Sequence, residues 1–307
     1  MKSYAAQPLP SKEERLIRFG SVPPIPGNKP TTKEKMSDLQ NRSHDYLFNI
    51  NQVGICKVRH PIQIRSELIP DIQTTVAELT LTTSLQRESK GINMSRLTEL
   101  LERYRREKWE ADFEGLQRLA AEMAEYMEQT QAEIELEFPW FYERSSPVLG
   151  MTGLNHSQAS MKVIYAQGNP LEFVLKLQTA VTTLCPCSKE ISEYSAHNQR
   201  GNVTVTVELD ETSLPQSDWK TLLLDAIESN ASSPLHPVLK RPDEKAVTER
   251  AYENPRFVED MARLVAADLY EMDFVKAFKV ECRNEESIHL HDALAVISFD
   301  NTTEAAL

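Results

Sequence analysis

Reactive side chains gather in one short stretch of this 307-residue chain. Residues 183–201 read TLCPCSKEISEYSAHNQRG and bring two thiols, a lysine, two carboxylates and an imidazole to the end of an apolar run. Pro186 removes a backbone donor, so we expect a strand to end there and to leave the Cys185 thiolate reachable by a metal or a substrate. The alternative is that Cys185 and Cys187 are small residues that fill a turn. Their spacing is poorly suited to a disulfide between them.

A second polar cluster, residues 285–291 with the sequence EESIHLH, lies inside another apolar run. On a strand, His289 and His291 would face the same way, and two imidazoles on one face are a recurrent metal-binding geometry. Glu286 has the opposite parity, so a bulge or a turn before Ser287 is needed to bring it round. The alternative is a pair of surface histidines beside acidic residues. Two separated clusters of thiols, imidazoles and carboxylates suggest one metal site that folding assembles.

A third segment, residues 237–245, carries two adjacent cations followed by two adjacent carboxylates. Its two prolines indicate a loop. Lys240 and Arg241 could bind an anion there and Glu244 could ligate a metal, although a solvated charged loop is the simpler interpretation of this segment alone. Glu259 lies near the start of a predicted helix, where a glutamate normally faces water.

Charge and hydropathy restrict the class of protein. The formal net charge of −12 argues against a general nucleic-acid binder, but a local cluster of cations can still bind a small anion. No apolar run is long enough to span a bilayer, and the N-terminus lacks the apolar core of a secretory signal. We therefore expect a cytoplasmic protein whose four cysteines are free thiols or metal ligands, with no nucleic-acid or membrane partner.

The elements that must position these side chains follow a proline-rich polar segment. We expect an extended or disordered arm over residues 1–48, then a first module over 49–168 and a second over 169–307. In the first module, a strand-like apolar series from residue 53 precedes a strand at 75–83, helices around 97–104 and 116–127, and strands at 132–143 and 157–166. In the second module, strands are expected at 172–183, 202–209, 274–282 and 288–299, and helices at 219–227 and 255–270.

Two helix starts carry sequence signals. Asn93 or Ser95 is expected to cap the first helix of the first module, and Pro255 to lie in the first turn of the last helix. Both modules then have the order strand, strand, helix, helix, strand, strand. This order predicts an α+β fold in which a helix pair covers one face of an antiparallel sheet. The other face must meet another module or subunit, which favours a closed oligomer.

Taken together, these motifs resemble the type IB GTP cyclohydrolases. The resemblance spans residues 49–299 and rests on five motifs in order: Leu184–Ser192, His197–Gly201, Lys240–Glu244, Thr248–Pro255 and Glu286–His291. It implies tandem tunnelling-fold modules, a barrel closed by oligomerisation, and a homotetramer with active sites at subunit interfaces. The implied reaction converts GTP and water to 7,8-dihydroneopterin triphosphate and formate, the first step toward folate.

The resemblance also implies residue roles. Cys185 matches the essential cysteine at or beside the metal, and His197 matches the histidine that shuttles protons during ring opening. Three residues match the metal shell, with His291 next to them: Glu244, Glu286 and His289. Glu259 matches the carboxylate that anchors the guanine edge. Cys187 has a minor role, and whether Asp243 ligates the metal is left open.

Substrate and metal contacts are less sharply defined by the residues. Four cations are candidates for the triphosphate: Lys240, Arg241, Arg200 and Lys189. The mixed donor set suits zinc but also iron or manganese. Two other functions compete with the GTP cyclohydrolase: a related enzyme that stops at a cyclic-phosphate pterin, and a non-catalytic purine- or pterin-binding module. A metal site would serve no purpose in the latter, which argues against it.

Overall fold

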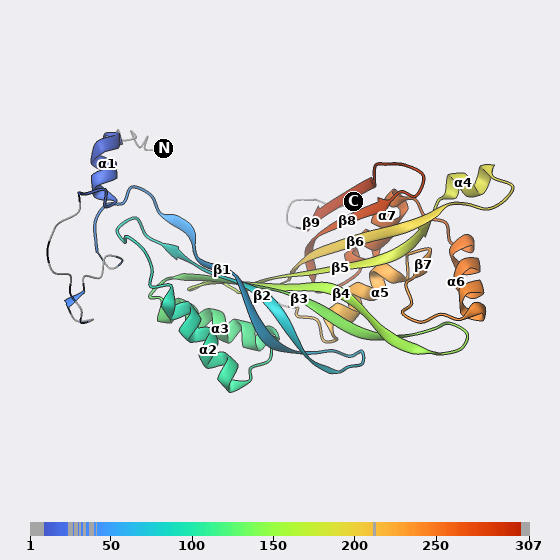
Figure 1. Ribbon diagram of the computed structural model, residues 1–307, viewed down its shortest axis with the longest axis horizontal. Helices are drawn as coiled ribbons and strands as arrows, with labels where there is room; N and C mark the ends of the chain where they lie inside the picture. Colours follow the sequence, from blue (N-terminus) through green and yellow to red (C-terminus); the bar gives the residue numbers. More distant parts are fainter. Residues whose placement is uncertain are drawn as a thin grey trace.

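The structure, a computed structural model, describes residues 9–23, 27, 30, 32, 35, 36, 40, 42–210 and 213–301. Figure 1 shows an elongated molecule in which long twisted strands run through the centre and helices lie along the sides and at both ends. The strands are β1 (Ile50–Arg65), β2 (Ile72–Leu85), β3 (Gln131–Ser145), β4 (Thr152–Ala166), β5 (Glu172–Leu184), β6 (Asn198–Leu209), β7 (Ser233–Pro234), β8 (Val275–Glu285) and β9 (Ala293–Asp300). The helices are α1 (Lys12–Arg18), α2 (Ser95–Glu107), α3 (Phe113–Tyr126), α4 (Pro186–Ile191), α5 (Trp219–Glu228), α6 (Arg241–Glu253) and α7 (Val258–Tyr270).

These strands form one antiparallel sheet with the order β1-β2-β3-β4-β5-β6-β8-β9, and the short β7 pairs with β5. The predicted element order occurs twice, from β1 to β4 and from β5 to β9, with α4, β7 and α6 added in the second half. The predicted boundary at residue 168 falls in the turn between β4 and β5, and the sheet continues across it. The fold is therefore α+β, as expected, and the sheet remains open in a single chain.

The two faces of the sheet differ in chemistry because most of the strands alternate apolar and polar residues. One row of directly paired residues crosses six strands and is buried throughout: Leu79, Leu136, Met161, Leu175, Val207 and Phe278. The next row is polar: Glu78, Glu137, Ser160, Lys176, Thr206 and Lys279. The helices cover the apolar face, with α3 against β3 and β4, α5 against β5, and α7 against β8 and β9.

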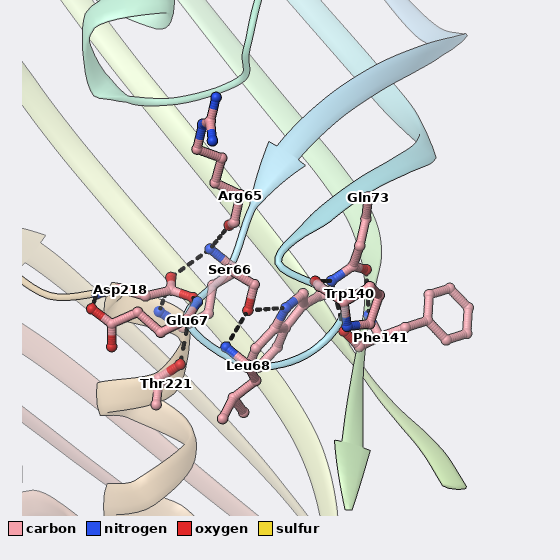
Figure 2. A network of polar contacts seen from close by, with 11 residues as sticks. Arg65, Ser66, Glu67, Leu68, Gln73, Trp140, Phe141, Asp218 and Thr221 are labelled. Carbon is pink, nitrogen blue, oxygen red and sulfur yellow. Dashed lines mark hydrogen bonds and ion pairs between the residues drawn. The ribbon is translucent and has the colours of Figure 1, made fainter.

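A network of polar contacts connects the two halves of the chain where the β1–β2 loop meets the start of α5 (Figure 2). Asp218, the N-cap of α5, accepts a hydrogen bond from the backbone N–H of Glu67 at 3.2 Å, and its own N–H donates to the Glu67 carboxylate at 3.0 Å. The Lys220 ammonium lies 2.5 Å from the Asp218 carboxylate and also donates to the carbonyl of Arg65 at 2.9 Å. Trp140 on β3 donates to the neighbouring Ser66 hydroxyl at 3.2 Å. These contacts attach α5 to the first half of the sheet.

Two segments differ from their predicted conformation. The loop predicted over 237–245 is wrong beyond residue 240, because α6 begins at Arg241 and continues to Glu253. Pro242 lies in the first turn of α6, where its missing N–H would have no helical partner in any case. The arm predicted over 1–48 falls partly outside the described residues, and within it Lys12–Arg18 form α1 rather than extended chain. None of the described helices is long and apolar enough to cross a membrane.

Two helix starts also differ. The last helix, α7, begins at Val258, so Pro255 precedes it instead of lying in its first turn. The backbone N–H of Arg256 donates to the carbonyl of Leu184 at 2.9 Å and holds the intervening segment against the end of β5. Helix α2 is capped by neither predicted residue, because helical backbone already begins at Met94 (φ −58°, ψ −25°).

Candidate functional site

Cys185 stands at the junction between β5 and α4. The strand ends at Leu184, Cys185 is the N-cap of α4, and Pro186 occupies the first turn. The Cys185 Sγ atom lies 3.5 Å from the backbone nitrogen of Ser188, which donates to it. The side chain is half-buried, whereas Cys187 is exposed. The predicted strand exit is confirmed, and the thiol remains accessible there.

The same junction brings Cys185 opposite His197. The pairing of β5 with β6 ends at Leu184 and Asn198, and the Cys185 N–H then donates to the His197 carbonyl at 3.1 Å. The Ser188 hydroxyl donates to the Cys185 carbonyl at 3.2 Å and accepts from the His197 N–H at 3.2 Å. The backbones of the two candidate catalytic residues are therefore held together from both sides.

A buried amide orients the His197 ring. His197 Nδ1 lies 2.9 Å from Gln199 Oε1, and Gln199 Nε2 donates to the Thr183 hydroxyl at 3.0 Å. Gln199 and Thr183 are both buried. Since the amide oxygen only accepts, neutral His197 carries its proton on Nδ1 and presents Nε2 as a proton acceptor. This role of Gln199 was not predicted from the sequence, where its one signal is that Gln199 and His197 share strand parity.

The predicted histidine pair lies in a turn. The strand predicted over 288–299 begins only at Ala293, so His289 and His291 belong to the β8–β9 turn and do not alternate on a strand. Their rings nevertheless stack, with centroids 4.8 Å apart and an interplanar angle of 13°. Half-buried Glu286 directly follows β8, and the turn begins at Ser287, one residue after Glu286 and not before Ser287 as its reorientation was expected to require. The β8–β9 turn therefore brings the two histidine rings together, where strand alternation was expected to do so.

Both clusters lie at one end of the sheet. Arg200 on β6 pairs with Thr182 on β5 and with Glu285 on β8, so the ends of these three strands are side by side (Figure 1). Thiol, imidazole and carboxylate donors together have the chemistry that zinc, iron or manganese accepts. Yet no group of three or more His, Cys, Asp and Glu side chains converges to hold a metal ion in the described parts of one chain. The metal shell named from the sequence thus remains a prediction.

The cations at the start of α6 are exposed, whereas the acid between them and Glu244 is not. Lys240 is the N-cap and Arg241 the first residue of the helix. Asp243 is 0% exposed and accepts hydrogen bonds from three backbone N–H groups. Burial alone would raise the pKa of Asp243, but these N–H donors and the Ser146 hydroxyl lower it to about 2. Because both of its oxygens accept these hydrogen bonds, Asp243 has the contacts of a structural residue and not those of a metal ligand.

The remaining substrate candidates lie on different elements. The Lys189 ammonium donates to the Tyr252 carbonyl at 2.5 Å and lies 4.3 Å from the centre of the Tyr252 ring. Lys189 would have to exchange these contacts for phosphate. Arg200 is exposed on β6, and exposed Glu259 lies in the first turn of α7. One chain therefore unites Cys185 with His197 but leaves the other candidates distributed around the same end of the molecule.

Comparison with known proteins identifies the class first. The structure superposes on uricase from Arthrobacter globiformis with a TM-score of 0.50 at 11% sequence identity, covering 83% of this chain and 95% of the uricase chain. This likeness concerns the fold alone and makes the chain a tunnelling-fold protein.

The sequence comparisons identify the family. The model for "Type I GTP cyclohydrolase folE2" matches residues 36–295. The chain is 56% identical over 296 residues to GTP cyclohydrolase FolE2 of Bacillus subtilis (strain 168), covering 96% of this chain and 97% of the relative. It is 58% identical over 290 residues to GTP cyclohydrolase FolE2 of Halalkalibacterium halodurans, covering 94% and 97%. The chain belongs to the type I GTP cyclohydrolase FolE2 family, as its motifs predicted.

Proposed function

We propose that this protein is a GTP cyclohydrolase that converts GTP and water to 7,8-dihydroneopterin triphosphate and formate for tetrahydrofolate biosynthesis. The observation that carries the proposal is the Cys185–His197 pair, which the ends of β5 and β6 hold together in a chain of this family. Neither the cyclic-phosphate enzyme nor the non-catalytic binding module has support in the comparisons.

His197 is the proton carrier in this proposal. Its Nδ1–H is held by Gln199, so Nε2 can take up a proton and return it as the imidazole ring of guanine opens. Since Gln199 is itself fixed by Thr183, the ring keeps one orientation through the reaction. Cys185, whose backbone N–H is bonded to the His197 carbonyl, supplies the essential thiol in this proposal.

The metal shell in this proposal has five members: Cys185, Glu244, Glu286, His289 and His291. A divalent ion bound there, whether zinc, manganese or iron, would lower the pKa of a water molecule and so supply a nucleophile for the weakly electrophilic C8 of guanine. The stacked rings of His289 and His291 lie in the β8–β9 turn, and Glu286 lies directly before it.

Substrate recognition falls to two kinds of group. The Glu259 carboxylate can accept hydrogen bonds from N1 and N2 of guanine together, and loss of one such charged contact costs about 1.5–3 kcal/mol. Four cations are assigned to the triphosphate: Lys240, Arg241, Arg200 and Lys189. The protein would act as a homotetramer with active sites between subunits, and its free cysteines suit a cytoplasmic location.

The decisive assay uses metal-loaded protein and GTP. We expect formate release and, after oxidation and dephosphorylation, pterin fluorescence, with a product mass that corresponds to the triphosphate. Cys185→Ala should lose this activity. Cys187→Ala is the matched control, because it removes an exposed thiol two residues away and should retain activity. Absence of formate with zinc, manganese and iron alike would overturn the proposed function, and full activity in Cys185→Ala would overturn the role of that thiol.

A further inference from the structure

The hairpin of β3 and β4 holds the segment that leads into α6. Asn155 on β4 donates from its side-chain amide to the carbonyl of Leu235 at 2.8 Å. On the other strand, the carbonyl of Ser145 lies 3.1 Å from Nδ1 of His236. Two consecutive residues of the segment are therefore attached to the two strands of one hairpin.

Packing continues this attachment toward the helix. A Cβ atom placed on Gly153 would lie 2.9 Å from Cγ of Pro237 and 3.1 Å from Cγ2 of Val238. Distances this short leave no room for a side chain, so the β4 backbone touches the segment directly. The absence of a side chain at residue 153 is what allows the close approach.

The last of these contacts joins the tip of the β3–β4 hairpin to Asp243. One carboxylate oxygen of Asp243 accepts from the backbone N–H groups of Val148 and Leu149, both at 3.0 Å. The other oxygen accepts from the N–H of Lys240, also at 3.0 Å. A single buried carboxylate therefore joins the tip of a hairpin in the first half of the chain to the N-cap of a helix in the second half.

We propose that Asp243 is a positioning residue: by clamping the N-terminus of α6 to the β3–β4 hairpin, it sets where Lys240, Arg241 and Glu244 stand for the reaction. The proposal rests on the proposed function, which assigns those three side chains to the triphosphate and the metal. Asp243 itself touches neither.

The geometry explains why one carboxylate has this effect. Lys240 and Arg241 have exposed side chains, so it is their backbone that the fold can fix before substrate arrives. The bond to the Lys240 N–H fixes the N-cap of α6, and the two bonds to the hairpin tip fix the helix against the sheet. Misplacement of binding groups by about 1 Å can lower a rate by about 100-fold.

Two variants test the proposal by independent routes. In Asp243→Asn, an NH₂ group replaces one accepting oxygen and cannot serve both the hairpin tip and Lys240. In Gly153→Ala, the added methyl group presses on Pro237 and Val238 and leaves the Asp243 carboxylate unchanged. For both full-length variants we expect the KM for GTP and the metal concentration for half-maximal activity to rise, with kcat/KM lower by about tenfold to 100-fold.

Asp112→Asn is the matched control. Asp112 caps α3 by accepting from the Gly115 N–H at 2.8 Å, and we place it outside the site, in the first half of the chain. This variant makes the same carboxylate-to-amide change, but the asparagine oxygen can still cap α3, so stability, KM and the metal requirement should stay unchanged.

The outcomes separate the two proposals. If the wild-type protein releases no formate from GTP, the proposed function is wrong. If the wild type is active and both Asp243→Asn and Gly153→Ala keep its KM and metal requirement, the positioning role is wrong. The role is equally wrong if Asp112→Asn changes KM as much as they do. Should Asp243→Asn fail to fold, the KM of Gly153→Ala decides alone.

Discussion

Glu228 is a carboxyl group that the fold buries beside a single close cation. Its side chain is 7% exposed and accepts a hydrogen bond from Arg144, whose guanidinium lies 5.7 Å from the centre of the Tyr142 ring. Burial raises the pKa of Glu228 to about 6, although Arg144 opposes the rise. Asp225 on the same helix raises this pKa further, and Arg250 on α6 lowers it. Desolvation therefore outweighs the ion pair at this residue.

This raised pKa predicts a loss of stability with rising pH. Between pH 4.5 and about 6 the folded protein keeps the Glu228 proton while the unfolded chain releases it, so the free energy of unfolding falls as pH rises through that window. The full effect is roughly 2 kcal/mol, complete above the folded-state pKa. Urea unfolding of the wild type and of Glu228→Gln from pH 4.5 to 8 measures it as the difference between the two proteins.

The glutamine variant is the control because it cannot titrate. We expect the stability of the wild type relative to Glu228→Gln to decrease across the window and then to level off. A difference that stays constant from pH 4.5 to 8 would show that burial does not shift this carboxyl group.

At the scale of elements, the alternation of apolar and polar residues predicts the strands of the sheet, and helical spacing of apolar residues predicts most helices. Neither pattern predicts where the ends of different elements meet. Strands such as β6 follow directly from alternating Val203, Val205 and Val207. The start of α6 could not be predicted, because Lys240 and Arg241 precede a proline that reads equally as a loop or as a first helical turn. The contacts of Asp243 decide between these two conformations, and two of its partners, Val148 and Leu149, lie 95 and 94 residues away in the sequence.

The candidate site was likewise predicted from the sequence only in part. The motif sequence named Cys185 and His197, and the register of β5 with β6 brings them together. The stacking of His289 on His291 arises from a turn, and local patterning alone favoured a strand. Support from Gln199 and Thr183 depends on long-range strand pairing, which periodicity does not specify.

The attachment of α5 to the β1–β2 loop gives the prediction at this scale (Figure 2). Asp218 and Lys220 each have 7% exposed side chains, and burial lowers the pKa of Lys220 although Asp218 opposes that change. Asp218→Ala leaves the Lys220 charge buried without its carboxylate and removes the cap of α5, so we expect a loss of about 3–5 kcal/mol of unfolding free energy. Urea unfolding at one fixed protein concentration, followed by tryptophan fluorescence, measures this change.

A double variant isolates the ion pair. In Asp218→Ala with Lys220→Met, no charge is left unpaired, so the protein should be more stable than Asp218→Ala alone. If the double variant is no more stable than the single one, the buried lysine is not the source of the loss.

For the whole molecule, a single chain leaves the sheet incomplete. Its edges, β1 and β9, are the outermost strands in the sheet order, and the helix-free face carries charged rows such as Glu78, Glu137 and Lys176. Open edges and an uncovered face are features that further copies of the same chain can close in a symmetric assembly. These features are consistent with a closed oligomer.

Helix α6 indicates which residues the assembly has to bring together. Its C-terminal Tyr252 contacts Lys189 of α4, close to Cys185, while Glu244 lies at the opposite end, roughly 12 Å away along the helix axis. Cys185 and Glu244 were assigned to one metal shell. Within the described residues of one chain, however, no three such donors come together. The proposed sites between subunits therefore predict that Glu244 of one chain completes the site of a neighbouring subunit.

Subunit mixing tests this arrangement directly. Cys185→Ala and Glu244→Ala should each be inactive in formate release, because every site of either homo-oligomer lacks one donor. When the two are unfolded together and refolded as mixed oligomers, random pairing places an intact Cys185 opposite an intact Glu244 in about one quarter of the sites, so about a quarter of the wild-type activity should return. The two variants refolded separately and then combined are the control for reactivation without exchange. Activity in the mixed oligomers that stays at the level of this control would mean that one chain supplies both donors.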